Sequence, residues 1–125
     1  MANILIVDDN QDACAGLEKI LTAAGHHVTC VPNGREALAQ VISETPDVVL
    51  LDLMMPEMDG PSFLQVVRLY LRDKSLPVVV LTGFNESPMI ERALHLKVNS
   101  VLVKGKASSK EIQNALEDAI ASAQK

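Results

Sequence analysis

The chain has 125 residues, of which 48% are hydrophobic and 22% are charged, and its formal net charge is −5. This composition is ordinary for one globular domain and excludes the disordered and fibrous classes. The acidic balance argues against direct nucleic-acid binding, because the phosphate backbone attracts clustered Lys and Arg, which are scattered here.

The first half of the chain predicts three strands that alternate with two helices. A strand at 4–7 is followed by a helical segment that ends at Gly25. The strand at 28–31 includes Thr29, so we expect it at an exposed edge of the sheet. Asn33 and Glu36 have capping-box spacing, which places a helix start near residue 34, and a third strand follows at 48–51. The faces that the two helices would bury carry Ala13, Leu17, Ile20, Leu21 and Ala24, and then Ala37, Leu38, Val41 and Ile42.

The second half continues the alternation with three helices and with strands at 78–81 and 101–103. Pro61 and Pro88 each suit a first helical position. Ser108 and Glu111 have capping-box spacing and place the last helix start near residue 109. The buried faces of these helices would carry Leu64, Val67 and Leu71, then Ile90, Ala93 and Leu94, and then Ile112, Leu116, Ala119, Ile120 and Ala123. The alternation predicts one doubly wound α/β domain over residues 1–125, with five parallel strands and five helices.

Polar residues follow four of the predicted strands. Asp8 and Asp9 follow the first strand, Asp52 the third, Thr82 the fourth and Lys104 the fifth. Because ligands of open α/β sheets bind at the carboxyl ends of the strands, we expect these side chains to converge. Carboxylates ~5 Å apart repel by about 3 kcal/mol per pair, so three of them require a cation or a proton. Oxygen ligands favour Mg²⁺, and the whole set suits phosphoryl transfer to a central carboxylate.

Each of these residues also has an ordinary structural interpretation. Asp8 and Asp9 could cap the first helix, Thr82 could simply pack, and Lys104 could be a solvated charge. Their joint placement after four strands favours the functional interpretation. The remaining candidate ligands lack this placement or metal-ligand spacing, and we interpret them as structural: His26, His27, His95, Cys14 and Cys30.

Four segments carry the most specific patterns in the chain: ILIVDDN at 4–10, VVLLDLMMPEMDG at 48–60, PVVVLTG at 77–83 and VLVKG at 101–105. Through them the sequence resembles the receiver domain of two-component response regulators over essentially its whole length. The resemblance implies a flavodoxin-like sheet of strand order 2-1-3-4-5. It also implies that Asp52 accepts a phosphoryl group from a phosphohistidine on a sensor kinase or phosphotransfer protein.

The resemblance further implies the metal ligands of the site. Asp9 and Asp52 would ligate Mg²⁺ together with the backbone carbonyl of Met54, and Asp8 would act mainly through bound water. Pro56 and Gly60 would shape the loop after the third strand, because proline fixes φ and glycine can adopt φ above zero. Phosphorylation would shift a pre-existing equilibrium of the loops after the fourth and fifth strands and of the fourth helix, and so change the affinity for partners.

The resemblance also implies that Thr82 hydrogen-bonds a phosphoryl oxygen and that Lys104 pairs with Asp52 or with the phosphoryl group. Two departures from the family pattern lie at positions that would transmit the effect of phosphorylation from Asp52 to a partner. The family usually has Pro in a cis peptide after the Lys, whereas Gly105 follows here, so we expect a trans bond and a looser loop. The usual aromatic residue three positions before the Lys is replaced by Val101. Phe84 is a candidate for a substitute rearrangement or for ordinary packing.

The sequence leaves two other functions open. One is an aspartyl-phosphate phosphatase, but such enzymes usually carry a second Asp where Met54 stands, so a general acid is missing. The other is a pseudo-receiver that signals by binding alone. We therefore predict a regulatory phosphoacceptor, not an enzyme acting on external substrates. Its partners would be a histidine kinase or phosphotransfer protein and a downstream protein target, without nucleic acid.

No apolar run approaches the roughly 20 residues that cross a bilayer, and the chain does not open with a signal-peptide pattern. We accordingly predict no membrane insertion and a cytoplasmic location.

Overall fold

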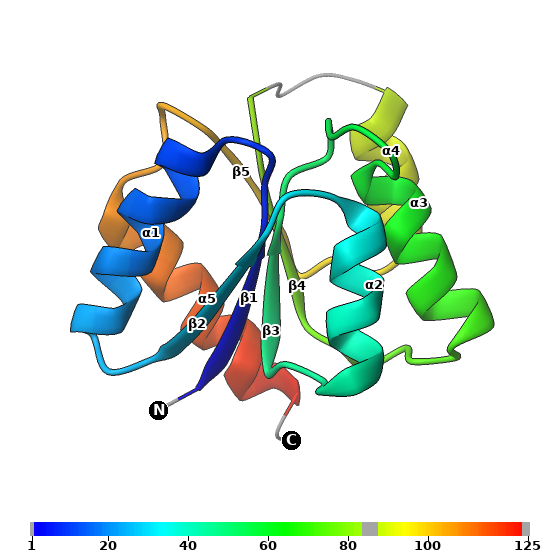
Figure 1. Ribbon diagram of the computed structural model, residues 1–125, viewed down its shortest axis with the longest axis horizontal. Coiled ribbons are helices and arrows are strands. Elements are labelled where there is room, and N and C mark those ends of the chain that lie inside the picture. The colour runs from blue at the N-terminus through cyan, green and yellow to red at the C-terminus, as the bar shows by residue number, and fades with distance from the viewer. Residues whose placement is uncertain (1, 84–87, 124–125) are drawn as a thin grey trace.

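The computed structural model describes residues 2–83 and 88–123, so Phe84 lies outside the described residues (Figure 1). Its strands form one parallel sheet in the order β2-β1-β3-β4-β5. The strands are β1 (Asn3–Val7), β2 (His27–Val31), β3 (Val48–Leu51), β4 (Val78–Thr82) and β5 (Ser100–Val103). The predicted doubly wound fold, the strand order and the edge position of β2 are confirmed.

Helices cover both faces of this sheet, with α1 and α5 on one side and α2, α3 and α4 on the other (Figure 1). Their bounds are α1 (Gln11–Ala23), α2 (Gly34–Ser43), α3 (Gly60–Gln65), α4 (Pro88–His95) and α5 (Ser109–Ala123). Because both faces are packed, every residue of β3 and β4 is buried. Among the described residues, no helix is long and apolar enough to cross a bilayer.

Side-chain caps fix where the helices begin. The Asn33 side chain accepts a hydrogen bond from the Glu36 N–H (2.9 Å), and α2 begins at residue 34 as predicted. Ser108 Oγ accepts from the Glu111 N–H (3.1 Å) while the Glu111 carboxylate accepts from the Ser108 N–H (3.1 Å), so both halves of the capping box are present. Each cap stabilises its helix by about 1 kcal/mol.

The buried faces predicted for all five helices are partly wrong, since Ala24 and Ala123, on the predicted faces of the first and last helices, are also exposed. Ile42 on α2 is 67% exposed, Leu94 on α4 is 55% exposed and Leu71 is 40% exposed. For Leu71 the reason is a change of helix type. After Gln65 the helix continues as a π-helical segment, η1 (Val66–Tyr70), in which the Leu71 N–H bonds to the Val66 carbonyl five residues back. The wider turn moves Leu71 out of the core.

The same change of helix type directs Arg68 toward the interior, where only 4% of the residue remains exposed. Its Nε donates to the Leu96 carbonyl (2.9 Å), and its Nη1 donates to the Asp73 carbonyl (3.0 Å). Its Nη2 donates to the carbonyls of Leu76 (2.8 Å) and Lys97 (2.9 Å). Arg68 thus ties the end of η1 to the segment before β4 and to the turn after α4.

Candidate functional site

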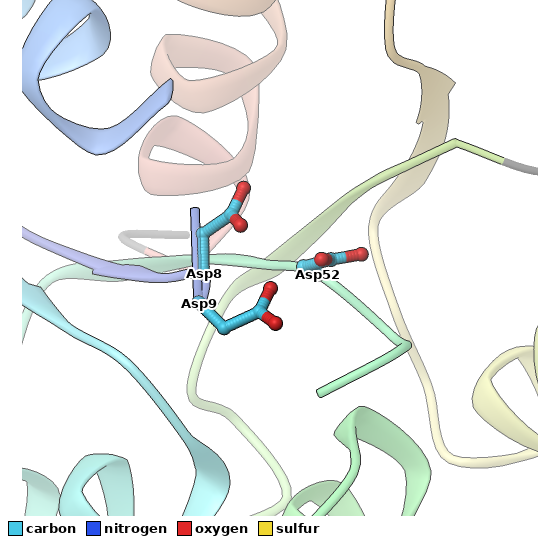
Figure 2. Close-up of side chains that lie close together, drawn as sticks. All are labelled: Asp8, Asp9 and Asp52. Atoms are coloured by element: carbon cyan, nitrogen blue, oxygen red, sulfur yellow. The ribbon is translucent and has the colours of Figure 1, made fainter. Parts of the chain in front are cut away.

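Three carboxylates meet at the carboxyl edge of the sheet. Asp8 and Asp9 follow β1 and Asp52 follows β3, and these strands are neighbours in which the Asp52 N–H bonds to the Val7 carbonyl (2.9 Å). One carboxylate oxygen of each residue lies within 4.8 Å of the others. Figure 2 shows the side chains of Asp8 and Asp9 extending toward Asp52. The convergence expected from the strand ends is therefore present.

Burial differs among the three acids. Asp8 and Asp52 are only 5% and 7% exposed, whereas Asp9 is exposed to solvent. The cluster is thus open on one side, through which an ion or a phosphodonor can approach. Three clustered carboxylates form a hard-oxygen donor set that fits a divalent cation such as Mg²⁺.

Lys104 comes from the end of β5 and reaches two of these acids. Its Nζ lies 2.6 Å from Asp8 Oδ2 and 3.3 Å from Asp52 Oδ2. The pairing with Asp52 was expected, but Asp8 is the nearer partner and was not anticipated. Asp8 Oδ1 also accepts a hydrogen bond from the Asn10 N–H (2.9 Å), so both oxygens of Asp8 are engaged.

The electrostatics of the site leave Asp52 with a destabilised charge. Burial is the main cause that raises the pKa of Asp52, and the charge of Asp8 raises it further. Lys104 and a backbone hydrogen bond with Met54 act in the opposite direction without cancelling the shift. For Lys104, burial lowers the pKa, but the carboxylates of Asp8 and Asp52 outweigh burial and leave the pKa raised. A bound cation would relieve the repulsion between the acids.

Thr82 and Lys104 lie side by side at the ends of β4 and β5. Thr82 is 1% exposed, and its carbonyl accepts the Lys104 N–H (2.8 Å). After Lys104 the peptide bond is trans, as expected, and Gly105 has φ +83°. The turn after Lys104 is closed by hydrogen bonds, because the N–H groups of Lys106 and Ala107 both bond to the Val103 carbonyl.

Val101, at the position where the sequence departs from the family pattern, is partly buried and packs against the core cluster on the α2, α3 and α4 side of the sheet. β5 therefore carries a partly buried aliphatic side chain at this position, and valine has no ring that can change orientation.

The loop after β3 holds Asp52 through contacts that the sequence did not reveal. A Cβ on Gly60 would lie 2.8 Å from the Asp52 carbonyl oxygen and 2.8 Å from Leu53 Cα. Close approach therefore requires this glycine, and the positive φ in the loop belongs to Glu57 (66°) instead. Asn33 Nδ2 donates to Glu57 Oε2 (2.8 Å) and so braces the loop against the start of α2. The only sequence signal for this brace was the cap role of Asn33.

The fold and the site together define a flavodoxin-like domain with an acidic pocket at the carboxyl edge of its sheet. Over residues 4–117 the sequence matches the protein family described as the response regulator receiver domain. The chain belongs to this family, whose members are regulatory modules of two-component signalling.

Two similar proteins differ in length from each other. The chain is 36% identical over 101 residues to the probable transcriptional regulator ycf27 of Guillardia theta, covering 81% of this chain and 39% of that protein. It is 35% identical over 102 residues to an uncharacterised 14.6 kDa protein of Leptolyngbya boryana, covering 82% of this chain and 78% of that protein. The chain thus spans well under half of ycf27, and about a quarter of the transcriptional regulatory protein ZraR of Salmonella typhimurium (26%).

Solved structures share the whole architecture. The chemotaxis response regulator CheY4 of Vibrio cholerae matches with a TM-score of 0.85 at 28% identity, covering 95% of this chain and 98% of that chain. A CheY-like receiver domain protein from Methanospirillum hungatei JF-1 matches with a TM-score of 0.91 at 19% identity, covering 99% and 97%, a likeness that concerns the fold alone.

Proposed function

We propose that this protein is a phosphoacceptor of two-component signalling in which Asp52 receives a phosphoryl group and the modified protein changes its affinity for a partner. The observation that carries the proposal is the cluster of Asp8, Asp9 and Asp52 within 4.8 Å, with Lys104 bound to two of its members. A central, buried carboxylate with an adjacent cation and an exposed acid is suited to accept a group with a high negative charge.

In the proposed reaction, a carboxylate oxygen of Asp52 attacks the phosphorus of the donor. A new O–P bond forms, the P–N bond of a phosphohistidine breaks, and the imidazole leaves with the bonding electron pair and takes up a proton. The Lys104 ammonium, 3.3 Å from Asp52, offsets the negative charge of the reacting oxygens. The Thr82 hydroxyl, at the end of the neighbouring strand, is proposed to bind a phosphoryl oxygen.

Mg²⁺ is the cation that we propose for the acidic cluster, with Asp9, Asp52 and the Met54 carbonyl as ligands and Asp8 acting through water. When bound, it supplies positive charge that neutralises the carboxylates and the phosphoryl oxygens. Asp9 is the exposed member of the cluster, so an ion bound there can exchange with ions in solution.

A sensor histidine kinase or a phosphotransfer protein is the proposed donor, and a further protein is the proposed target. A pseudo-receiver that binds without phosphorylation is the second candidate, favoured by Val101 and Gly105 at the output side of β5. The phosphatase alternative lacks a general acid at Met54, so we propose a regulatory protein and not an enzyme. The cytoplasmic location stays a prediction.

The test is to incubate the protein with Mg²⁺ and acetyl phosphate and to measure its intact mass. We expect a gain of one phosphoryl group that requires Mg²⁺ and is absent in Asp52→Asn. Asp47→Asn is the matched control, because Asp47 is an exposed acid before β3, and it should gain the group normally.

The same measurement separates the three candidates. No gain with acetyl phosphate or with any of a panel of phosphorylated kinases would replace the proposal with the pseudo-receiver. Continuous release of phosphate from many phosphoesters would replace it with the phosphatase.

A further inference from the structure

A cationic hollow lies at the pole of the molecule opposite to Asp52. It has a volume of about 440 Å³ and is formed between the end of η1, the segment before β4, the turn before β5 and the end of α5. All these segments meet at the amino ends of β4 and β5, whereas Asp52 follows the carboxyl end of β3. Polar residues that line the hollow are Arg68, Lys74, Ser75, Lys97, Asn99 and Ser122.

The charge of the hollow contrasts with that of the chain. Three cations and no acid line it, although the protein carries a net charge of −5. Within residues 2–83 and 88–123, none of the three cations forms an ion pair, and no side-chain hydrogen bond engages the ammonium groups of Lys74 and Lys97. The carboxylate of Asp73 is the charge that acts on Arg68, and it accepts hydrogen bonds from the Ser75 and Leu76 N–H groups. The exposed ammonium groups of Lys74 and Lys97 are therefore the charges available to an anion.

The hollow is held in shape before any ligand arrives. Arg68 is nine-tenths buried and binds carbonyls on both loops that form the walls, those of Asp73 and Leu76 on one side and of Leu96 and Lys97 on the other. The walls are therefore fixed relative to each other, which lowers the entropic cost of binding.

Lys97 has a backbone conformation that its residue type disfavours. Its φ is +61° two positions after His95, the last residue of α4, where glycine is the usual residue because it has no Cβ. Strained residues of this kind cluster at functional sites. Arg72 has a similar φ of +57° but does not line the hollow, so it provides an internal comparison.

We propose that this hollow binds a small phosphate-bearing anion. The Arg68 fork is already filled by carbonyl oxygens, so it cannot bind a planar carboxylate in the two-pronged manner that arginine favours. The free groups are instead the point charges of Lys74 and Lys97, which suit a phosphate. The volume lies within the range of small-molecule sites and exceeds that of a single inorganic ion.

The test is to titrate the full, ¹⁵N-labelled chain with inorganic pyrophosphate in Mg²⁺-free buffer and to follow the amide resonances by NMR. We expect saturable shifts at Lys97, Asn99 and Ser122. The double variant Lys74→Gln with Lys97→Gly should raise the Kd at least tenfold. It should remain folded, because glycine relieves the positive φ, and Lys97→Gly alone should raise Tm by about 4 °C.

Matched variants make the result specific. Arg72→Gly removes a charge and a positive φ outside the hollow, and Lys19→Gln removes a charge on α1, so both should leave the Kd within twofold. Asp52→Asn should also leave it unchanged, which separates this proposal from the phosphoacceptor proposal.

Four outcomes would overturn the inference. An unchanged Kd in the double variant would mean an adventitious ion only, and shifts centred on Lys104 would move the binding to the acidic site. Equal affinity for citrate would reject the phosphate class. Shifts of the hollow's amides by a poly-glutamate peptide but not by pyrophosphate would make the hollow a docking surface for a protein segment.

Discussion

Without a bound metal ion, the buried negative charge of Asp52 lowers the stability of the folded protein. Because its pKa is raised by burial and by Asp8, the native state binds a proton more tightly than the unfolded chain does. Stability is therefore lost as the pH rises from the ordinary carboxyl pKa of about 4 through the raised value. We predict that Asp52→Asn raises the free energy of unfolding by on the order of 1 kcal/mol at pH 7 without Mg²⁺.

Urea unfolding as a function of pH checks this prediction. The gain should shrink as the pH falls toward 4, where Asp52 of the wild type becomes protonated. A variant that is less stable than the wild type at pH 7 without Mg²⁺ would show that Lys104 outweighs burial and the repulsion from Asp8.

The absence of a Cβ at Gly60 allows the backbone at Gly60 to approach the backbone at Asp52 closely. Gly60→Ala would place Cβ 2.8 Å from the Asp52 carbonyl oxygen, and we predict a loss of about 2 kcal/mol of stability and a slower gain of phosphate. Gly16→Ala is the control, since its Cβ meets nothing within 4 Å and it lies inside α1, where alanine should stabilise by roughly 1 kcal/mol. Thermal unfolding of both variants gives the comparison, and equal effects would refute the role assigned to the contact.

At this scale the sequence allowed the acidic cluster to be predicted because strand ends are visible as polar residues after apolar runs. Asp8, Asp9 and Asp52 needed no knowledge of side-chain direction. The hydrogen bond from Asn33 to Glu57 was not predictable, because it joins two loops 24 positions apart through a residue whose spacing already indicated a cap.

Among the elements, η1 differs most from expectation. Its periodicity predicted an α-helix that buries Leu71, and the structure buries Arg68 instead. Periodicity assumes a constant helical turn, so it could not detect a π-helical segment. The partners of Arg68 are backbone carbonyls, which every residue possesses and which therefore leave no pattern in the sequence.

Arg68 should accordingly be a structural determinant of the segment that it ties down. We predict that Arg68→Met lowers the free energy of unfolding by about 3 kcal/mol, because four carbonyl groups lose their donor. Arg92→Met is the matched control on the exposed side of α4 and should change stability by less than about 0.5 kcal/mol. Similar losses in the two variants, measured by urea unfolding, would contradict the role of Arg68.

At the scale of the whole molecule, element order and apolar runs were enough to predict the doubly wound fold, since each buried strand of a parallel sheet is apolar throughout. They did not predict which helix residues face solvent, as Ile42 and Leu94 show. Those exposures depend on how each helix lies on the sheet, which single-helix periodicity leaves undetermined.

Metal binding should raise the free energy of unfolding of the whole domain. Saturating Mg²⁺, at a hundredfold excess over its Kd, is predicted to raise the free energy of unfolding by about 2.7 kcal/mol. Removal of the ion with a chelator should reverse the gain, and Asp9→Asn should abolish most of it. A gain that persists in Asp9→Asn, seen in thermal unfolding, would place the ion elsewhere.

Identifying the phosphorylated residue tests most directly whether Asp52 is the phosphoacceptor. After reaction with acetyl phosphate and Mg²⁺, borohydride reduction converts an aspartyl phosphate into homoserine, which peptide mass spectrometry locates. We predict homoserine at position 52 and at no other aspartate. Homoserine at position 8 or 9, or phosphate that stays on a histidine or serine, would contradict it.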